Sequence, residues 1–172
     1  MQVIQDGGRV CLPPFVLNME TIKKHFNNNY VKGVKYSPMN LRLLDLIFEK
    51  AGEVKTVLDI GCGTGQLVNL LEDKGIKSMG IDFSEEAIKQ CKDNGTFVVG
   101  DIEKELPTGS YDLVFLKLVF AFIEDKDNLL KRIKKILTPD GKLVIITPVL
   151  TQETADKHLE KISIHEDILL CL

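Results

Sequence analysis

The stretch Thr56–Gly65 constrains the fold more than any other part of this sequence, because a short apolar run is followed by glycine at every second position. Val57, Leu58 and Ile60 predict a strand of the kind that a parallel sheet buries on both faces. The glycines permit positive φ and let a ligand approach bare backbone. The spacing of Gln66–Leu71 then predicts a helix whose free N–H groups lie beside the loop. Strand, loop and helix together indicate a small-molecule site at the carboxyl end of a strand.

The spacing of the glycines narrows the choice of ligand. It is Gly-x-Gly-x-Gly, with Gln66 where the dinucleotide-binding pattern has its third glycine. No Gly-Lys-Ser/Thr follows, which excludes a P-loop. Asp59 ends the strand just before the loop, where a carboxylate repels a phosphate and attracts an ammonium group. A glycine-rich turn alone also fits an ordinary tight strand-to-helix connection, so the rest of the chain must decide.

Two later strands also end in an acid. Ser78–Asp82 and Thr96–Asp101 are short, mainly apolar runs that each finish on aspartate. The carboxyl ends of parallel strands meet at one edge of a sheet, so these two acids and Asp59 are expected to cluster there. Like charges at that edge repel one another unless a ligand with hydrogen-bond donors lies among them. A carboxylate at the end of the second strand is suited to accept hydrogen bonds from ribose hydroxyls.

The segment before the loop predicts a hairpin and a first helix. Val3–Gln5 and Arg9–Leu12 flank a glycine-containing turn and favour a β-hairpin, with a disordered leader as the alternative. Asn18 is placed to cap a helix over Met19–Phe26, and the run Asn27–Asn29 is expected to end it.

A stronger helix signal follows. Ser37 provides a cap residue, Pro38 suits the first helical position, and Gly52 suits the end. The apolar face of this helix is expected to consist of Leu41, Leu44, Leu46, Ile47 and Phe48.

The second half of the chain alternates helices and strands. Ser84 is expected to cap a helix with Ala87, Ile88 and Cys91 on its inner face and an end at Asn94-Gly95. Further elements are a strand at Tyr111–Lys117, a helix at Asp125–Leu137, a turn at Pro139–Gly141 and a strand at Lys142–Thr147. This alternation predicts an α/β fold with a doubly wound, mostly parallel sheet.

Composition excludes several classes of function. A chain of 172 residues with 44% hydrophobic and 27% charged residues fits one soluble globular domain. A formal charge of −3 argues against binding to nucleic acid or a membrane surface, and no apolar run approaches a membrane span. The four cysteines are scattered, which predicts neither a metal site nor a disulfide framework and makes a reducing cytoplasm the expected location.

The ordered set of motifs resembles the class I S-adenosylmethionine (SAM) dependent methyltransferases, a family with a Rossmann-like fold. Val57–Gly65 is similar to its first motif, Gly80–Ser84 to the second and Gly100–Ile102 to the third. Tyr111–Phe115 resembles the fourth, and Leu137–Leu143 resembles the turn into strand five. The resemblance covers about Tyr36 to Pro148 and implies SAM as cofactor and S-adenosylhomocysteine as product.

The resemblance also implies roles for individual residues. Asp59 and the loop would hold the methionine part of the cofactor, Asp82 the ribose hydroxyls, and Phe83 would flank the adenine. Asp101 would take the adenine amino group and the Ile102 backbone a ring nitrogen. The implied cofactor-binding residues are Tyr36, Asp59, Gly61, Cys62, Gly63, Gly65, Asp82, Phe83, Asp101, Ile102 and Lys117. For Tyr36, which would reach the cofactor carboxylate, a packing role is the alternative, and for Lys117 a backbone contact is favoured.

The sequence departs from the family in two places. The run Leu116–Phe122, where many members carry polar residues near the methyl group, is apolar apart from Lys117. The family's sheet usually continues with a further helix and hairpin, whereas only 22 residues follow Leu150. We therefore expect three parts within one domain: residues 1–36, a SAM-binding core at 37–150, and a C-terminal helix with a possible edge strand at 151–172.

These observations predict methyl transfer by in-line displacement to a small-molecule acceptor, with no identifiable catalytic base and no metal. The alternatives are a SAM-binding or partner-binding module without activity and a nucleotide-dependent oxidoreductase. An uncovered strand-five edge would promote aggregation, so the run Ile164–Leu172 is expected to add an antiparallel sixth strand. A homodimer through the exposed edge is the next possibility.

Overall fold

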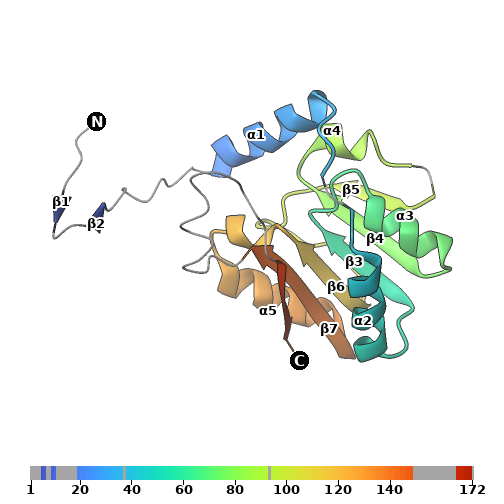
Figure 1. Ribbon diagram of the computed structural model, residues 1–172. Helices are drawn as coiled ribbons and strands as arrows, with labels where there is room; N and C mark the ends of the chain where they lie inside the picture. Colours follow the sequence, from blue (N-terminus) through green and yellow to red (C-terminus); the bar gives the residue numbers. More distant parts are fainter. Residues whose placement is uncertain are drawn as a thin grey trace.

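The computed structural model describes residues 5–6, 9–10, 19–36, 38–92, 94–148 and 166–171. Its centre is a six-stranded sheet with the order β5-β4-β3-β6-β7-β8 (Figure 1). The strands are β3 (Thr56–Ile60), β4 (Lys77–Asp82), β5 (Thr96–Val99), β6 (Tyr111–Lys117), β7 (Leu137–Pro148) and β8 (Glu166–Cys171). All neighbours pair in parallel except β7 and β8, which are antiparallel. The doubly wound, Rossmann-like sheet predicted from the sequence is confirmed.

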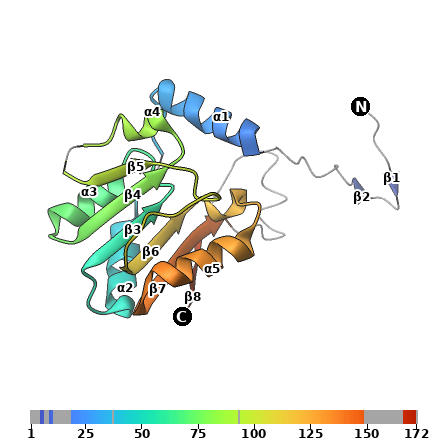
Figure 2. The same ribbon diagram turned by 180° about the vertical axis from the view of Figure 1, so that it is seen from behind.

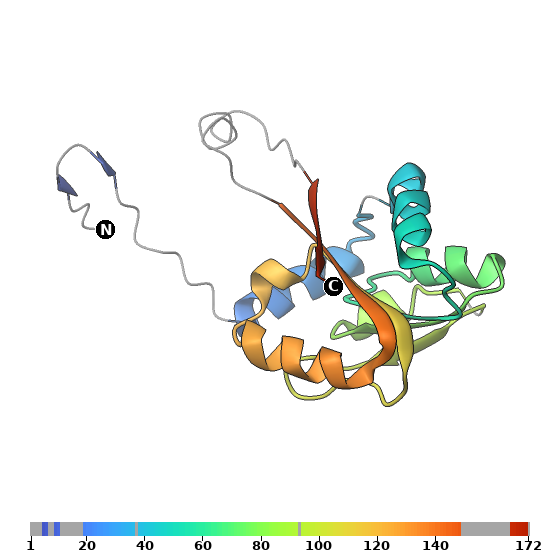
Figure 3. The same ribbon diagram turned by 90° about the horizontal axis from the view of Figure 1, so that it is seen from below.

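Helices cover both faces of the sheet (Figures 1 and 3). The helix α2 (Leu41–Ala51) and the helix α3 (Gln66–Asp73) pack on one face, and α5 (Lys126–Ile136) packs on the other. Successive strand residues point to opposite faces, so Val57 lies in one core with α2 and α3 while Leu58 lies in the other with α5. Both side chains are almost fully buried, which explains why β3 is a continuous apolar run.

Asp112 ties the amino-terminal ends of three strands together. Its Oδ2 accepts hydrogen bonds from the backbone N–H groups of Lys55 and Thr56, at 2.9 and 3.0 Å. The other oxygen accepts from the Thr138 hydroxyl at 3.2 Å, which joins β7 to β3 and β6. This aspartate is at the opposite end of the sheet from the three acids predicted to bind a ligand.

The helix α1 (Met19–Val31) lies beyond the carboxyl ends of the strands, beside α4 (Glu85–Ile88), as Figure 2 shows. The prediction that Asn27–Asn29 ends this helix was wrong, because the helix continues through them for another turn. Tertiary contacts override the low helix propensity of asparagine here. Asn27 accepts a hydrogen bond from Ser84, and Asn29 donates one to Tyr36. Asn18, the predicted cap, lies outside the described residues.

The start of α2 was also predicted wrongly. The helix begins at Leu41, where the side chain of Asn40 caps it by accepting from the N–H groups of Arg42 and Leu43. Pro38 precedes the helix, and Ser37 lies outside the described residues. Of the predicted apolar face, Leu44 and Ile47 are buried and Phe48 is partly buried, but Leu41 and Leu46 are 58% and 43% exposed. The predicted end at Gly52 is confirmed by its φ of 82°.

Three further boundaries differ from the sequence-based expectation. The helix α4 ends at Ile88, so Cys91 lies beyond it. The acid Asp101 likewise lies just past the end of β5. The expected turn Pro139–Gly141 falls inside β7, where the pairing with β6 shifts register between Tyr111 and Leu113. The extra residues of β7 lie in this irregularity, because Tyr111 pairs with Leu137 whereas Leu113, two residues later, pairs with Lys142.

The two strand predictions outside the core are confirmed. Gln5–Asp6 (β1) pairs antiparallel with Arg9–Val10 (β2), which is the predicted N-terminal hairpin. At the other end, Glu166–Cys171 pairs antiparallel with β7, with Ile168 opposite Ile146. The edge of the fifth parallel strand is therefore covered by the chain itself. The C-terminal helix predicted after Leu150 lies outside the described residues.

Candidate cofactor-binding and acceptor site

The glycine loop has the conformation that its sequence requires. Gly61, Gly63 and Gly65 have φ values of 73°, 53° and 71°, a backbone region that residues other than glycine rarely adopt. The backbone N–H groups of Gly61 and Cys62 both donate to the carbonyl of Ile81, at 2.8 and 3.1 Å. These bonds hold the loop against β4. A Cβ on Gly61 would lie 2.2 Å from the Val119 side chain, so the loop approaches the segment after β6 closely.

The acids at the ends of β3 and β4 are buried together. Asp59 and Asp82 are each 4% exposed. Burial, reinforced by the charge of Asp82, raises the pKa of Asp59 to about 7, although Lys117 counteracts this. Burial also raises the pKa of Asp82, against the backbone N–H groups of Ser84, Gly63 and Phe83, which favour the carboxylate. A cationic ligand group with hydrogen-bond donors would relieve the cost of ionising both.

Asp82 shapes the loop as well as facing the site. Its Oδ2 accepts from the N–H of Gly63, and its Oδ1 accepts from the N–H of Ser84, both at 2.9 Å. Asp82 therefore connects the glycine loop to the start of α4. Ser84 in turn caps α4, because its hydroxyl accepts from the N–H of Ala87 at 3.1 Å. This confirms the predicted cap.

The third acid, Asp101, is paired with a lysine from α1. Its Oδ2 accepts from Lys23 Nζ at 2.5 Å, while its Oδ1 accepts from the N–H of Glu103 at 3.2 Å. Lys104 Nζ lies 3.8 Å from the same Oδ2 on the outer side. Partial burial opposes ionisation of Asp101, but the bond from Lys23 and the neighbouring charges hold its pKa below the usual range.

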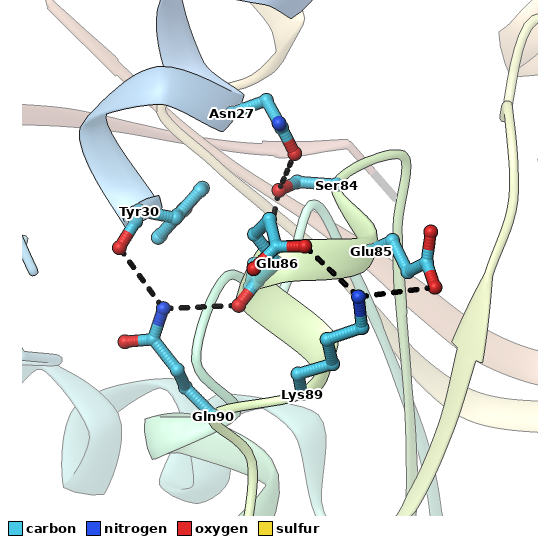
Figure 4. A network of polar contacts seen from close by, with 8 residues as sticks. Asn27, Tyr30, Ser84, Glu85, Glu86, Lys89 and Gln90 are labelled. Atoms are coloured by element: carbon cyan, nitrogen blue, oxygen red, sulfur yellow. Dashed lines mark hydrogen bonds and ion pairs between the residues drawn. The ribbon is translucent and has the colours of Figure 1, made fainter. Parts of the chain in front are cut away.

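Polar contacts fix α1 against α4, and Figure 4 shows them together. The hydroxyl of Ser84 donates to Asn27 Oδ1 at 2.7 Å. The side-chain amide of Gln90 donates to the backbone carbonyls of Tyr30 and Glu86, at 3.0 and 2.9 Å. The amino end of α4, which begins beside Asp82, is thereby joined to the helix that covers the site.

A pocket lies between α1 and the carboxyl ends of β3, β4, β5 and β6. Nine of the residues predicted to bind the cofactor line it: Tyr36, Asp59, Gly61, Cys62, Asp82, Phe83, Asp101, Ile102 and Lys117. Gly63 and Gly65 do not line it. Gly63 instead supports Asp82, and Gly65 packs against the side chains of Phe97 and Cys91.

One end of the pocket is apolar. Leu118, Val119, Phe122 and Ile123, which follow β6, form its wall. Leu118 has a φ of 60°, a strained conformation that non-glycine residues adopt mainly where the surrounding structure imposes it. The ring of Phe26 on α1 meets the Phe122 ring edge-on, with 5.3 Å between centroids. The apolar run after β6, noted in the sequence as a departure, thus lines the site.

Sequence reasoning missed the contribution of α1. Ile22, Lys23, Phe26 and Tyr30 all line the pocket. Tyr30 is 7% exposed, and its hydroxyl lies 2.8 Å from where a Cβ on Gly63 would be. Burial, together with the charge of Asp82, raises the pKa of this phenol. The spacing of Ile22, Phe26 and Tyr30 at every fourth residue is the signal that marks this helical face, once the helix is not broken at the asparagines.

Within the described residues, no group of histidine, cysteine, aspartate and glutamate side chains has the arrangement of a metal site. None of the helices that the structure describes has the length and hydropathy required to span a bilayer.

Comparison with known proteins identifies the family of this site. A family model described as "Methyltransferase domain" matches residues 52–167. The chain is 33% identical over 142 residues to malonyl-[acyl-carrier protein] O-methyltransferase 2 of Ilyobacter polytropus, covering 73% of this chain and 54% of that protein. It is 27% identical over 144 residues to the malonyl-[acyl-carrier protein] O-methyltransferase of Priestia megaterium, covering 77% and 53%.

Solved structures agree on the fold. The TehB-like SAM-dependent methyltransferase of Corynebacterium glutamicum is 25% identical, with a TM-score of 0.56 and coverage of 76% of this chain and 73% of that one. The plantazolicin methyltransferase BpumL, solved with S-adenosylhomocysteine (SAH), is 21% identical, with a TM-score of 0.58 and coverage of 86% and 54%. The chain belongs to the SAM-dependent methyltransferase family. It spans about half the length of the curated relatives it matches.

The donor set of the pocket fits SAM. Buried carboxylates suit the ammonium group and the ribose hydroxyls of this cofactor. The positive-φ glycines let the loop pack closely against neighbouring side chains of the protein, where a Cβ would collide. Membership of this family also sets aside the nucleotide-dependent oxidoreductase considered from the sequence.

Proposed function

We propose that this chain transfers a methyl group from SAM to a carboxylate oxygen of a small acyl-type acceptor, free or attached to a carrier. The observation that carries the proposal is the apolar wall of Leu118, Val119, Phe122 and Ile123 at one end of the acid-lined pocket. An acyl chain packs on such a wall, and a carboxylate is already ionised at neutral pH, so no general base is required.

The work left to the protein is binding and orientation. Bound SAM supplies a methyl group on a positively charged sulfur, which departs as a neutral thioether. Asp59 would hold the ammonium group, Asp82 the ribose, and Phe83 would flank the adenine. The Phe26 ring, packed edge-on against Phe122, would help to exclude water from the acceptor once the acceptor is bound. Positioning of this kind can supply about 7 to 11 kcal/mol of barrier reduction.

The names of the relatives support the choice of acceptor. The two curated relatives described above are malonyl-[acyl-carrier protein] O-methyltransferases, whose names specify O-methylation of malonyl-[acyl-carrier protein]. This chain spans about half the length of these relatives, so their substrate is not assigned to it directly. Carrier-bound malonate is instead the first acceptor to test.

Methyl transfer from SAM with a radiolabelled methyl group tests the proposal directly. Malonyl-acyl carrier protein and malonyl-coenzyme A are supplied as acceptors, with acetyl-coenzyme A as a control that lacks the free carboxylate. We expect label in a base-labile methyl ester with both malonyl compounds and none with the acetyl compound. Label in a base-stable product would assign a different acceptor atom.

The second candidate is a SAM-binding module without activity. It is favoured by the run Leu116–Phe122, which is apolar apart from Lys117 where many family members carry polar residues near the methyl group. Calorimetric titration distinguishes the two: saturable SAH binding without turnover on any acceptor supports the module, whereas absence of binding at millimolar ligand contradicts both candidates.

A further inference from the structure

The ion pair between Lys23 and Asp101 occupies the carboxylate that the proposed function assigns to the adenine amino group. Lys23 is on α1, 78 residues before its partner, and it reaches Asp101 Oδ2 at 2.5 Å. Its side chain is 30% exposed and that of Asp101 is 21% exposed, so water screens the pair only in part.

The pair lies where two hollows meet. Lys23, Phe83, Gly100 and Asp101 line both the main pocket and a second, more open hollow between α1 and the end of β5. Glu20, Lys24, Asn27 and Val99 complete the outer hollow. An adenine ring flanked by Phe83 would therefore reach Asp101 at the position that Lys23 now holds.

The rest of α1 keeps Lys23 in place. Asn27 and the Tyr30 carbonyl are bonded to Ser84 and Gln90, one turn or two beyond Lys23 along the helix (Figure 4). The lysine is thus presented to Asp101 by a helix fixed independently of that contact. The remaining oxygen of Asp101 is engaged by the N–H of Glu103, so the lysine holds the oxygen that faces α1.

We propose that Lys23 competes with the adenine amino group for Asp101 and so determines how strongly this protein discriminates among purine rings at the 6-position. This inference rests on the proposed binding of SAM. Because Lys23 already donates to Oδ2, adenine must share that oxygen with the ammonium or displace it, and either reduces the gain from its own hydrogen bond. A purine with a 6-oxo group presents an acceptor, which can approach Lys23 while the ion pair stays intact.

Titration calorimetry with two probes, SAH and S-inosylhomocysteine, tests this in the full chain. We expect wild-type protein to favour SAH only slightly. In Lys23→Met, Asp101 faces the ring alone, so SAH should bind well and the 6-oxo group should be repelled. The ratio of the two dissociation constants should rise by about threefold to fivefold, the range expected from the loss of a partly exposed ion pair. Because both ligands are compared in one variant, a general loosening of α1 cancels from the ratio.

Matched variants complete the experiment. Lys24→Met and Lys104→Met remove the same charge from an exposed neighbour on α1 and from the far side of Asp101, and both should keep the wild-type ratio. Lys23→Arg preserves the ion pair and should also keep the wild-type ratio of dissociation constants. If Lys23→Met does not fold, Lys23→Gln takes its place. Saturable SAH binding with the same ratio in all variants would overturn the role of Lys23 and leave the cofactor assignment intact. Failure of wild-type protein to bind SAH would overturn the proposed function itself.

Discussion

Replacing Gly63 by valine separates backbone strain from steric conflict at the cofactor loop. Gly63 has a φ of 53°, and a Cβ there would lie 2.8 Å from the hydroxyl of Tyr30, which lines the pocket. The matched control is Gly75, between α3 and β4, with a φ of 78° and no heavy atom within 4 Å of its would-be Cβ. Both valines carry the left-handed strain, but only the one at Gly63 collides.

The strain costs about 1 to 2 kcal/mol for a single residue in this region. In a domain of this size it lowers the melting temperature by about 2 to 8 °C. Gly75→Val should show this fall and keep normal SAH affinity. Gly63→Val should show at least as large a fall and lose SAH binding, because the valine displaces Tyr30 and disturbs the N–H that Asp82 accepts at 2.9 Å. Calorimetry and thermal melting of both variants suffice, and normal SAH affinity in Gly63→Val would refute the reasoning.

Three further predictions concern the acids and the sheet edge. Asp82→Ala should weaken SAH binding by about 1.5 to 3 kcal/mol, the range for a hydrogen bond to a charged group. The control Asp112→Ala should lower the melting temperature and leave SAH affinity unchanged. If Asp82→Ala bound SAH as tightly as wild-type protein, Asp82 would not belong to the site. The pKa of Asp59 is raised from 3.8 to about 7, so the folded state binds an extra proton between these values and the free energy of unfolding falls as pH rises through that window. Asp59→Asn should flatten this dependence in denaturant titrations. Wild-type protein is expected to bind SAM more tightly as pH rises past 7, since Asp59 then ionises, and Asp59→Asn should abolish this change. An unchanged pH profile would contradict the shift. In hydrogen exchange, alternate amides of Glu166–Cys171 should be protected to an extent comparable with Val144–Ile146, since an edge strand donates to only one neighbour; uniformly rapid exchange would contradict the pairing.

The sequence predicted the strands well because burial on both faces leaves a strong local signal. β6 was predicted at its observed limits, and β3 and β4 within a residue or so. Three acids at strand ends and alternate glycines were enough to predict where a pocket lies, because Asp59, Asp82 and Asp101 all line it. Contacts between residues close together in the chain, such as the helix cap at Ser84, were also predicted correctly.

The contribution of α1 could not be predicted in the same way. Asparagine has low intrinsic helix propensity, and the three asparagines stay helical because Asn27 and Asn29 bond to Ser84 and Tyr36. Those partners are brought close only by the fold. The pairing of Lys23 with Asp101 spans 78 residues and has no local signature at all. The hydrogen bond from Thr138 to Asp112, beside the register shift in β7, likewise joins residues 26 positions apart.

The position of β8 has a consequence for the order in which the sheet is completed during protein synthesis. The five parallel strands all precede Glu166 in the chain, so they are synthesised before the strand that pairs with the outer side of β7. Until Glu166–Cys171 emerges, the backbone of Leu143–Ile146 exposes free N–H and C=O groups that another nascent chain can pair with. The solubility of newly made protein should therefore depend on Glu166–Cys171, although this strand lies outside the cofactor pocket. A stop codon before Glu166 is expected to lower the yield of soluble protein while leaving the residues of the pocket in the chain.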